Sequence, residues 1–111
     1  MGGGISGGFP GTGGGKPLQI HHFLTNKNKN FTPRFEDITN KYGLKLNDDW
    51  NKAKMPHQGR HPNDYHRYML NEIRKIDNIA KGDKNMFLDL FSKIKTKIIK
   101  NPDMLYKKYW N

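Results

Sequence analysis

The sequence contains no cysteine, which excludes disulfide bonds and thiolate metal ligands. It has no apolar run near the roughly 20 residues of a membrane-spanning helix, and its first residues lack the charged and apolar regions of a signal peptide. Acidic residues are scarce, at 10 against 20 lysines and arginines, and the net charge is +10. This excess predicts a polyanionic partner. Nucleic acid is the first candidate. A role as a ribosome-like structural protein, or binding to an anionic membrane surface, would explain the same charge.

The 111 residues allow a single folded domain. Residues 1–16 are mostly glycine and are predicted to be a flexible linker. A glycine-rich stretch before Lys16 faintly resembles a phosphate-binding loop, but such loops follow a buried strand and open a helix, and this one does neither. The folded domain is predicted to span residues 17–111, with a core at 17–80 and a helical extension at 84–111.

The hydrophobic pattern predicts a mostly helical α+β fold with two short strands. The first helix should have Thr32 as its N-cap and should stop at Gly43, and the second should have Pro62 at its first position. Asn101 and Pro102 should break the third helix, before a short aromatic segment. The expected strands are residues 17–24 and 52–55, and the expected helices are residues 32–42, 62–82 and 84–100.

All five histidines occur in two places, the doublet His21-His22 and the stretch from His57 to His66. Imidazole is the commonest transition-metal ligand in proteins. His57 and His61 are four residues apart and straddle a predicted helix start, so they can converge on one ion with His21 as a third ligand. Zinc or another divalent ion would then keep a coordination position open for water or a phosphate oxygen.

Adjacent residues of a strand face opposite sides, so His21 and His22 cannot easily bind the same ion. This geometry favours two different roles for the doublet: one histidine binds the metal ion, and the other is a general base that activates water. A histidine doublet can also be mere surface decoration, and two histidines four residues apart also arise by chance. The confinement of every histidine to these two places favours the functional interpretation, a metal-dependent nuclease.

Four other features of the sequence have bland explanations beside the functional ones. At its helical spacing Tyr65 is expected in the core rather than in catalysis, and Asn51 is explained as a turn residue. His66 is expected to contact phosphate or to lie exposed on a helix. The lysines after Arg74 form a solvated face, which on a nuclease would also hold the phosphate backbone.

Three segments together resemble a known family. They are the doublet after a short strand, the segment Leu46–Asn51, and the signature His-x-Gly-x-His-Pro-x-x-Tyr from His57 to Tyr65. Over residues 17–80 the chain resembles the AHH family, a branch of the HNH/endonuclease VII superfamily of ββα-metal nucleases. One departure is Ile20, which stands where the family has a small residue, so that packing before the doublet is expected to differ.

The resemblance implies a ββα-metal core with a short hairpin and additional C-terminal helices. It implies that His21, His57 and His61 bind a divalent metal ion (zinc, magnesium, manganese or nickel). His22 would be the general base, and Asn51 would hold the hairpin and the base in place. The ion would polarise the scissile phosphate and stabilise the leaving 3′ oxygen, while His22 takes a proton from the attacking water.

The same resemblance extends to substrate and setting. Arg60, His66, Lys52 and Lys54 would hold flanking phosphates of DNA, with RNA as the alternative, and with little sequence preference. Family members are often C-terminal toxin domains of Rhs and other polymorphic toxins. The chain would then be delivered within a larger polypeptide into the cytoplasm of a target bacterium. A cognate immunity protein, expected to be acidic, would neutralise it.

Two other classes of function remain at this point. The first is a non-catalytic, basic nucleic-acid-binding module whose histidines hold a structural metal. The second is a membrane-active toxin that uses the lysine-rich amphipathic helix at residues 84–100. The second alternative would leave the histidines without a role.

Overall fold

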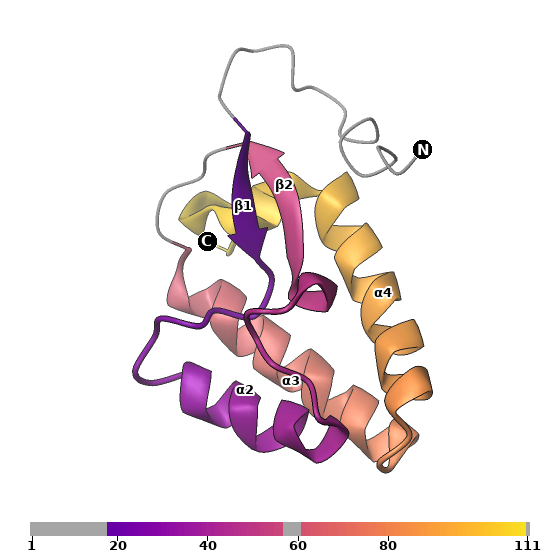
Figure 1. The fold of residues 1–111 in the computed structure, drawn as a ribbon. Helices are drawn as coiled ribbons and strands as arrows, with labels where there is room; N and C mark the ends of the chain where they lie inside the picture. The colour runs from indigo at the N-terminus through magenta and orange to yellow at the C-terminus, as the bar shows by residue number, and fades with distance from the viewer. Residues whose placement is uncertain (1–17, 57–60, 111) are drawn as a thin grey trace.

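The computed structural model describes residues 18–56 and 61–110 and shows an α+β fold, as the sequence predicts. An antiparallel hairpin stands at one end of three helices, with short 3-10 turns between and after them (Figure 1). The predicted linker at residues 1–16 lies outside the described residues. The strands are β1 (Leu18–His22) and β2 (Lys52–Pro56), and the helices are α2 (Thr32–Thr39), α3 (Asn63–Ala80) and α4 (Lys84–Lys100).

The register of the hairpin decides which face each histidine takes. His21 pairs with Ala53, and His22 pairs with Lys52. Residues directly opposite each other share a face, and successive residues alternate between faces. His21 and Ala53 therefore share the buried face, whereas His22 and Lys52 share the other one.

Helix ends follow the predicted residues closely, with two corrections. The N-cap of α2 is Phe31 and not Thr32, because the Thr32 hydroxyl bonds within the preceding loop instead. Pro62 is the N-cap of α3 rather than its first residue. Gly43, at φ 67°, ends the 3-10 turn that extends α2, as its position in the sequence predicts.

Helix α4 begins and ends at the predicted residues, and the Asp83 side chain caps its start by accepting from the Met86 N–H. Its lysines are not all on a solvated face. Lys95 is half-buried, and its ammonium group donates to the Trp50 carbonyl at 2.8 Å, which joins α4 to the loop before β2. Burial lowers the pKa of Lys95.

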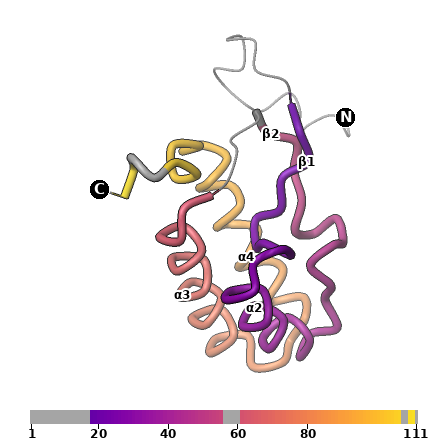
Figure 2. Tube along the Cα trace, turned by 90° about the vertical axis from the view of Figure 1, so that its left-hand side faces the viewer, coloured from indigo at the N-terminus to yellow at the C-terminus, as the bar shows by residue number. Residues whose placement is uncertain are grey.

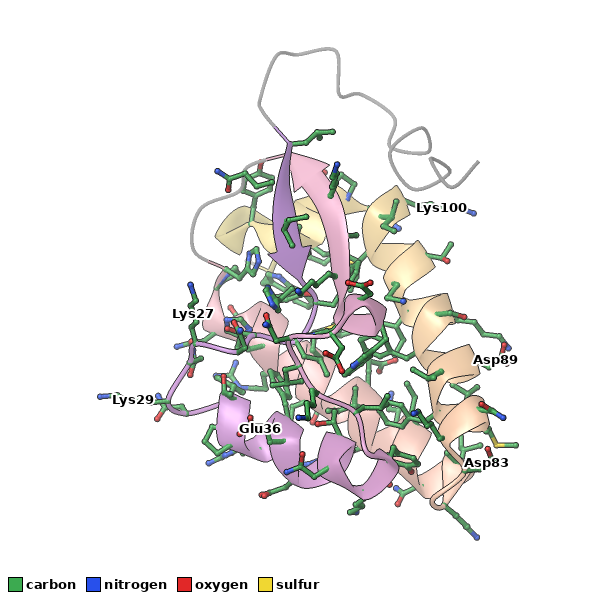
Figure 3. The ribbon with its side chains drawn as sticks, viewed as in Figure 1. Lys27, Lys29, Glu36, Asp83, Asp89 and Lys100 are labelled. Carbon is green, nitrogen blue, oxygen red and sulfur yellow. The ribbon has the colours of Figure 1, made fainter. Side chains whose placement is uncertain are left out.

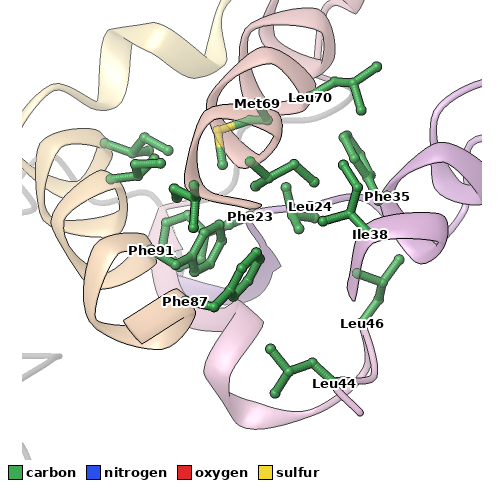
Figure 4. Packing of buried hydrophobic residues seen from close by; sticks show 14 of the residues in the cluster. Phe23, Leu24, Phe35, Ile38, Leu44, Leu46, Met69, Leu70, Phe87 and Phe91 are labelled. Atoms are coloured by element: carbon green, nitrogen blue, oxygen red, sulfur yellow. The ribbon is translucent and has the colours of Figure 1, made fainter. Parts of the chain in front are cut away.

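The core lies where the three helices meet the end of the hairpin (Figures 1 and 2). Phe23 directly follows β1, is fully buried and packs edge-on against Phe91 of α4, with ring centroids 6.4 Å apart. Phe87 stacks with Phe91 on the same helix, and Figure 4 shows both rings beside Phe23. The histidine doublet is thus continuous in sequence with the centre of the core.

The segment after α4 forms two 3-10 turns, Pro102–Leu105 and Lys107–Trp110. Met104 and Leu105 are buried, and the Trp110 indole donates to the Met104 carbonyl at 2.9 Å. Among the helices of the described residues, none is long and apolar enough to cross a membrane.

Candidate active site

The structure brings together two of the three predicted metal ligands. The His21 side chain extends from the buried face of β1, and the His61 side chain extends from the segment just before α3. Nδ1 of His21 and Nε2 of His61 lie 2.9 Å apart, and the ring centroids are 4.5 Å apart. Because a hydrogen bond at this distance needs one donor and one acceptor, one ring donates its N–H and the other accepts it. The two side chains point at one place, although 40 residues separate them in the chain.

Burial keeps these rings neutral. Burial first, and then His61, His22 and His66, lower the pKa of His21 from 6.5 to about 3. Burial and His66 lower the pKa of His61 to about 4, against a small opposing effect of the Leu105 backbone. A neutral imidazole has a free lone pair, and only in this state can it bind a metal ion or accept a proton.

His66 joins the pair from the first turn of α3. Its ring centroid lies 6.1 Å from that of His61, and Phe31 covers it at 5.5 Å. The side chain is buried, which contradicts the alternative of an exposed helix residue, and burial lowers the pKa of His66. It also lines a groove beside His61, so that a contact with phosphate remains open to it.

Three buried ring nitrogens in this cluster lack a hydrogen-bond partner of good geometry within the described chain. They are Nε2 of His21, Nδ1 of His61 and Nδ1 of His66. Buried polar groups in native proteins are almost always paired, since each unpaired group costs about 1–3 kcal/mol. So many unpaired nitrogens at one place indicate that this cluster is built to interact with something beyond the described residues.

The donor set fits a divalent metal ion in part. Two imidazole nitrogens bound at about 2.0–2.1 Å to a tetrahedral ion are about 3.3 Å apart, only a few tenths of an ångström more than here. However, no group of three or more histidines and carboxylates among residues 18–56 and 61–110 could hold a metal. The third predicted ligand, His57, lies outside these residues, as does the predicted phosphate contact Arg60.

His22 faces away from the His21–His61 pair. Its Nε2 lies 3.1 Å from Oδ1 of Asn47, in the loop before β2. Because an amide oxygen only accepts, this contact selects the tautomer of the neutral ring that has its proton on Nε2 and its lone pair on Nδ1. Lys52 lies directly opposite His22 on the same face, and Lys54 follows two residues later. Alternation along β1 predicts this division of faces, but the sequence alone gives no signal for Asn47.

The turn after the doublet is held from two sides. Asn51 is fully buried: its Oδ1 accepts from Leu24 N–H at 2.8 Å, and its Nδ2 donates to the carbonyls of Leu24 and Leu46 at 2.8 and 2.9 Å. The Tyr65 hydroxyl donates to the Phe23 carbonyl at 2.8 Å. Tyr65 is fully buried, as expected of a core residue, and it also fixes the chain immediately after His22.

The sequence matches the AHH family over residues 4–98, a family described as nucleases of the HNH/ENDO VII superfamily with conserved AHH. The chain belongs to the AHH nuclease family. It is therefore a phosphodiester hydrolase, and nucleases of the HNH superfamily generally use a divalent metal ion. Comparison with curated proteins and with solved structures gives no match.

The match to the AHH family covers more of the chain than the motifs do. The match extends through most of α4, whose residues contain no recognisable motif. The chain has Ile20 where the family's Ala-His-His has alanine, but Ile20 is 58% exposed and lies opposite Lys54. The larger side chain therefore takes no room from the core.

Proposed function

We propose that this AHH-family protein is a metal-dependent DNA endonuclease in which His22 is the general base. One observation carries the proposal. A pair of neutral, converging histidines lies on one face of β1, and a histidine with a free Nδ1 lies on the other face beside Lys52. General-base catalysis needs such a lone pair within reach of water, and metal binding needs the neutral pair.

In this mechanism His22 accepts a proton at Nδ1 from the water that attacks phosphorus, and the bond to the 3′ oxygen breaks. Asn47 holds the ring and its tautomer through Nε2. His21 and His61, with His57 as the predicted third ligand, would hold a divalent ion, which supplies positive charge against the charge that develops on the phosphate. Lys52 and Lys54, with Arg60 and His66, hold the neighbouring phosphates.

The biological setting belongs to the same proposal. The protein acts as an antibacterial toxin domain, delivered within a larger polypeptide into the cytoplasm of a target bacterium. An acidic immunity protein neutralises it, since a net charge of +10 favours an acidic inhibitor. DNA is the proposed substrate, and RNA is the alternative that the experiment distinguishes.

The test is incubation of the purified protein with supercoiled plasmid and with total RNA, in magnesium, manganese, zinc, nickel or chelator. Metal-dependent nicking is expected. His22→Ala should lower it by about a hundredfold or more, because general-base catalysis typically contributes that much. Its metal content and unfolding temperature should stay unchanged, because His22 is only partly buried and its side chain makes a single hydrogen bond within residues 18–56 and 61–110.

Ile20→Ala is the matched control, because it changes a neighbouring residue on the same face and should cleave like the unmodified protein. Cleavage of RNA alone would change the substrate and keep the mechanism. Full activity of His22→Ala would show that another group is the base. An intact plasmid and intact RNA under every ion would refute the proposed reaction.

A further inference from the structure

A groove of about 600 Å³ opens directly beside His61 and His66. One wall is formed by these two histidines and Asn63, at the start of α3. The other wall is formed by the loop of residues 25–30, which connects β1 to α2. None of the described residues that line the groove is acidic, so a bound anion would meet no negatively charged side chain among them.

The loop is held in its shape by its own side chains. The Thr32 hydroxyl accepts from the Asn28 N–H at 2.9 Å and donates to the Thr25 carbonyl at 2.8 Å. Oδ1 of Asn28 accepts from the N–H groups of Asn30 and Phe31 at 2.8 and 3.0 Å. These hydrogen bonds within the loop and to Thr32 fix the path of its backbone.

Two lysines remain uncommitted on this fixed loop. Lys27 and Lys29 are exposed, and Figure 3 shows both side chains pointing outward from the loop. Among the ion pairs of the described residues, neither lysine has a carboxylate partner. Exposed lysines without partners neutralise phosphates readily, because no ion pair has to be broken first.

The opposite wall also favours an anion. His66 is only 5% exposed, and its Nδ1 has no hydrogen-bond partner in the described part of the chain. Helix α3 starts at Asn63, and its N-cap Pro62 gives no side-chain hydrogen bond to the first turn. The N–H groups of Tyr65 and His66 bond to the Pro62 carbonyl, and Asp64 of the first turn pairs with Arg67. Asn63 lines the groove, so the positive end of the helix dipole lies beside it.

We propose that this groove binds the phosphodiester backbone of the nucleic-acid substrate next to the cleavage site. Lys27 and Lys29 neutralise successive phosphates on one wall, and His66 with the start of α3 receives a phosphate on the other wall. The bound nucleic-acid strand thus runs from the His21–His61 pair along the loop of residues 25–30. This inference rests on the proposed function. It adds a second basic surface to the one that Lys52 and Lys54 form on the hairpin.

The test measures binding without cleavage. A fluorescein-labelled DNA duplex is titrated with His22→Ala protein in chelator, by fluorescence anisotropy, over a series of salt concentrations. Adding Lys27→Ala and Lys29→Ala should weaken binding on the order of tenfold at low salt. The slope of log affinity against log salt should fall by about 1.8, since each phosphate contact contributes about 0.9.

Two controls separate a defined groove from diffuse charge. Lys84→Ala with Lys93→Ala removes the same charge from exposed positions of α4, which lies across α3 from the loop (Figure 1). If the backbone lies in the groove the slope should stay unchanged, whereas a fall would assign the backbone to the α4 lysines, the role that their sequence pattern also allows. Lys27→Arg with Lys29→Arg keeps the charge and should keep the slope. Equal losses from both alanine pairs, or no loss from the loop pair, would overturn the inference.

Cleavage assays keep this inference distinct from the proposed function. With His22 present, the loop pair should raise KM and leave kcat nearly unchanged. Normal KM in the loop variant, beside metal-dependent cleavage, would refute the groove and leave the nuclease mechanism. Loop-dependent binding by a protein that never cleaves would refute the proposed reaction and leave the groove.

Discussion

At the scale of single residues, two asparagines of one loop have opposite roles. Asn51 is fully buried and forms three hydrogen bonds to backbone groups. Asn47 is exposed, and within the described part of the chain its side chain bonds only to the His22 ring. The first asparagine fixes the path of the chain after β1, and the second holds a single side chain. Substituting each in turn separates folding from chemistry.

Asn51→Ala should lower the free energy of unfolding by about 3 kcal/mol, because it leaves three buried backbone groups unpaired. Urea unfolding followed by circular dichroism measures this loss. Asn47→Ala is the matched control: it should leave stability within about 0.5 kcal/mol and lower only the cleavage rate. A loss below about 1 kcal/mol for Asn51→Ala would show that water or rearrangement replaces its hydrogen bonds.

At the scale of elements, the turn between α3 and α4 depends on two left-handed residues. Lys81 has φ 47° and Gly82 has φ 92°. A β-carbon added to Gly82 would meet no atom within 4 Å, so any cost of substitution there comes from the backbone alone. This separation of causes makes the turn a clean test of conformational preference.

Gly82→Ala should lower the free energy of unfolding by about 1 kcal/mol, because residues other than glycine rarely adopt a positive φ. Lys81→Gly should act in the opposite direction and raise it by about 0.5 kcal/mol, as relief of strain exceeds the added entropy of the unfolded chain. Chemical denaturation of both variants measures the pair. Equal stability of the two variants would contradict the assigned backbone angles.

The elements also show how far sequence reasoning reaches. The bounds of α4 are predictable to the residue because Asp83, the apolar stripe and Pro102 all agree. The N-cap of α2 is not, because Thr32 has two uses available and the loop takes its hydroxyl. Strand alternation predicts that His21 and His22 face apart. The contact of His22 with Asn47 and the burial of His66 depend on tertiary packing, which no local pattern contains.

At the scale of the whole molecule, three neutral histidines lie together inside a strongly basic protein. Burial lowers the pKa of His21 to about 3 and of His61 to about 4, and it also lowers that of His66. In the unfolded chain these groups have a pKa near 6.5. Below that value the unfolded state binds protons that the folded state does not, so acid favours unfolding.

The metal-free protein should therefore have its full stability above pH 6.5 and should lose it progressively as the pH falls towards 4. Urea unfolding in chelator, at several pH values between 7.5 and 4.5, measures this dependence. His61→Gln removes one of the three groups and should flatten the curve. A free energy of unfolding that stays constant between pH 6.5 and 4.5 would show that the three rings become protonated without opening the fold.

The packing of Phe23 against Phe91 has a consequence for the order of synthesis. A ribosome makes the histidine doublet early and makes α4 far later, and chains fold as their segments emerge. Until α4 has emerged, Phe23 lacks its aromatic partner Phe91, and the turn that follows His22 lacks the part of the core that this helix supplies. The nascent chain therefore contains every histidine well before it can assemble them. In the cell that synthesises the protein, the complete histidine site therefore forms only after α4 has been translated.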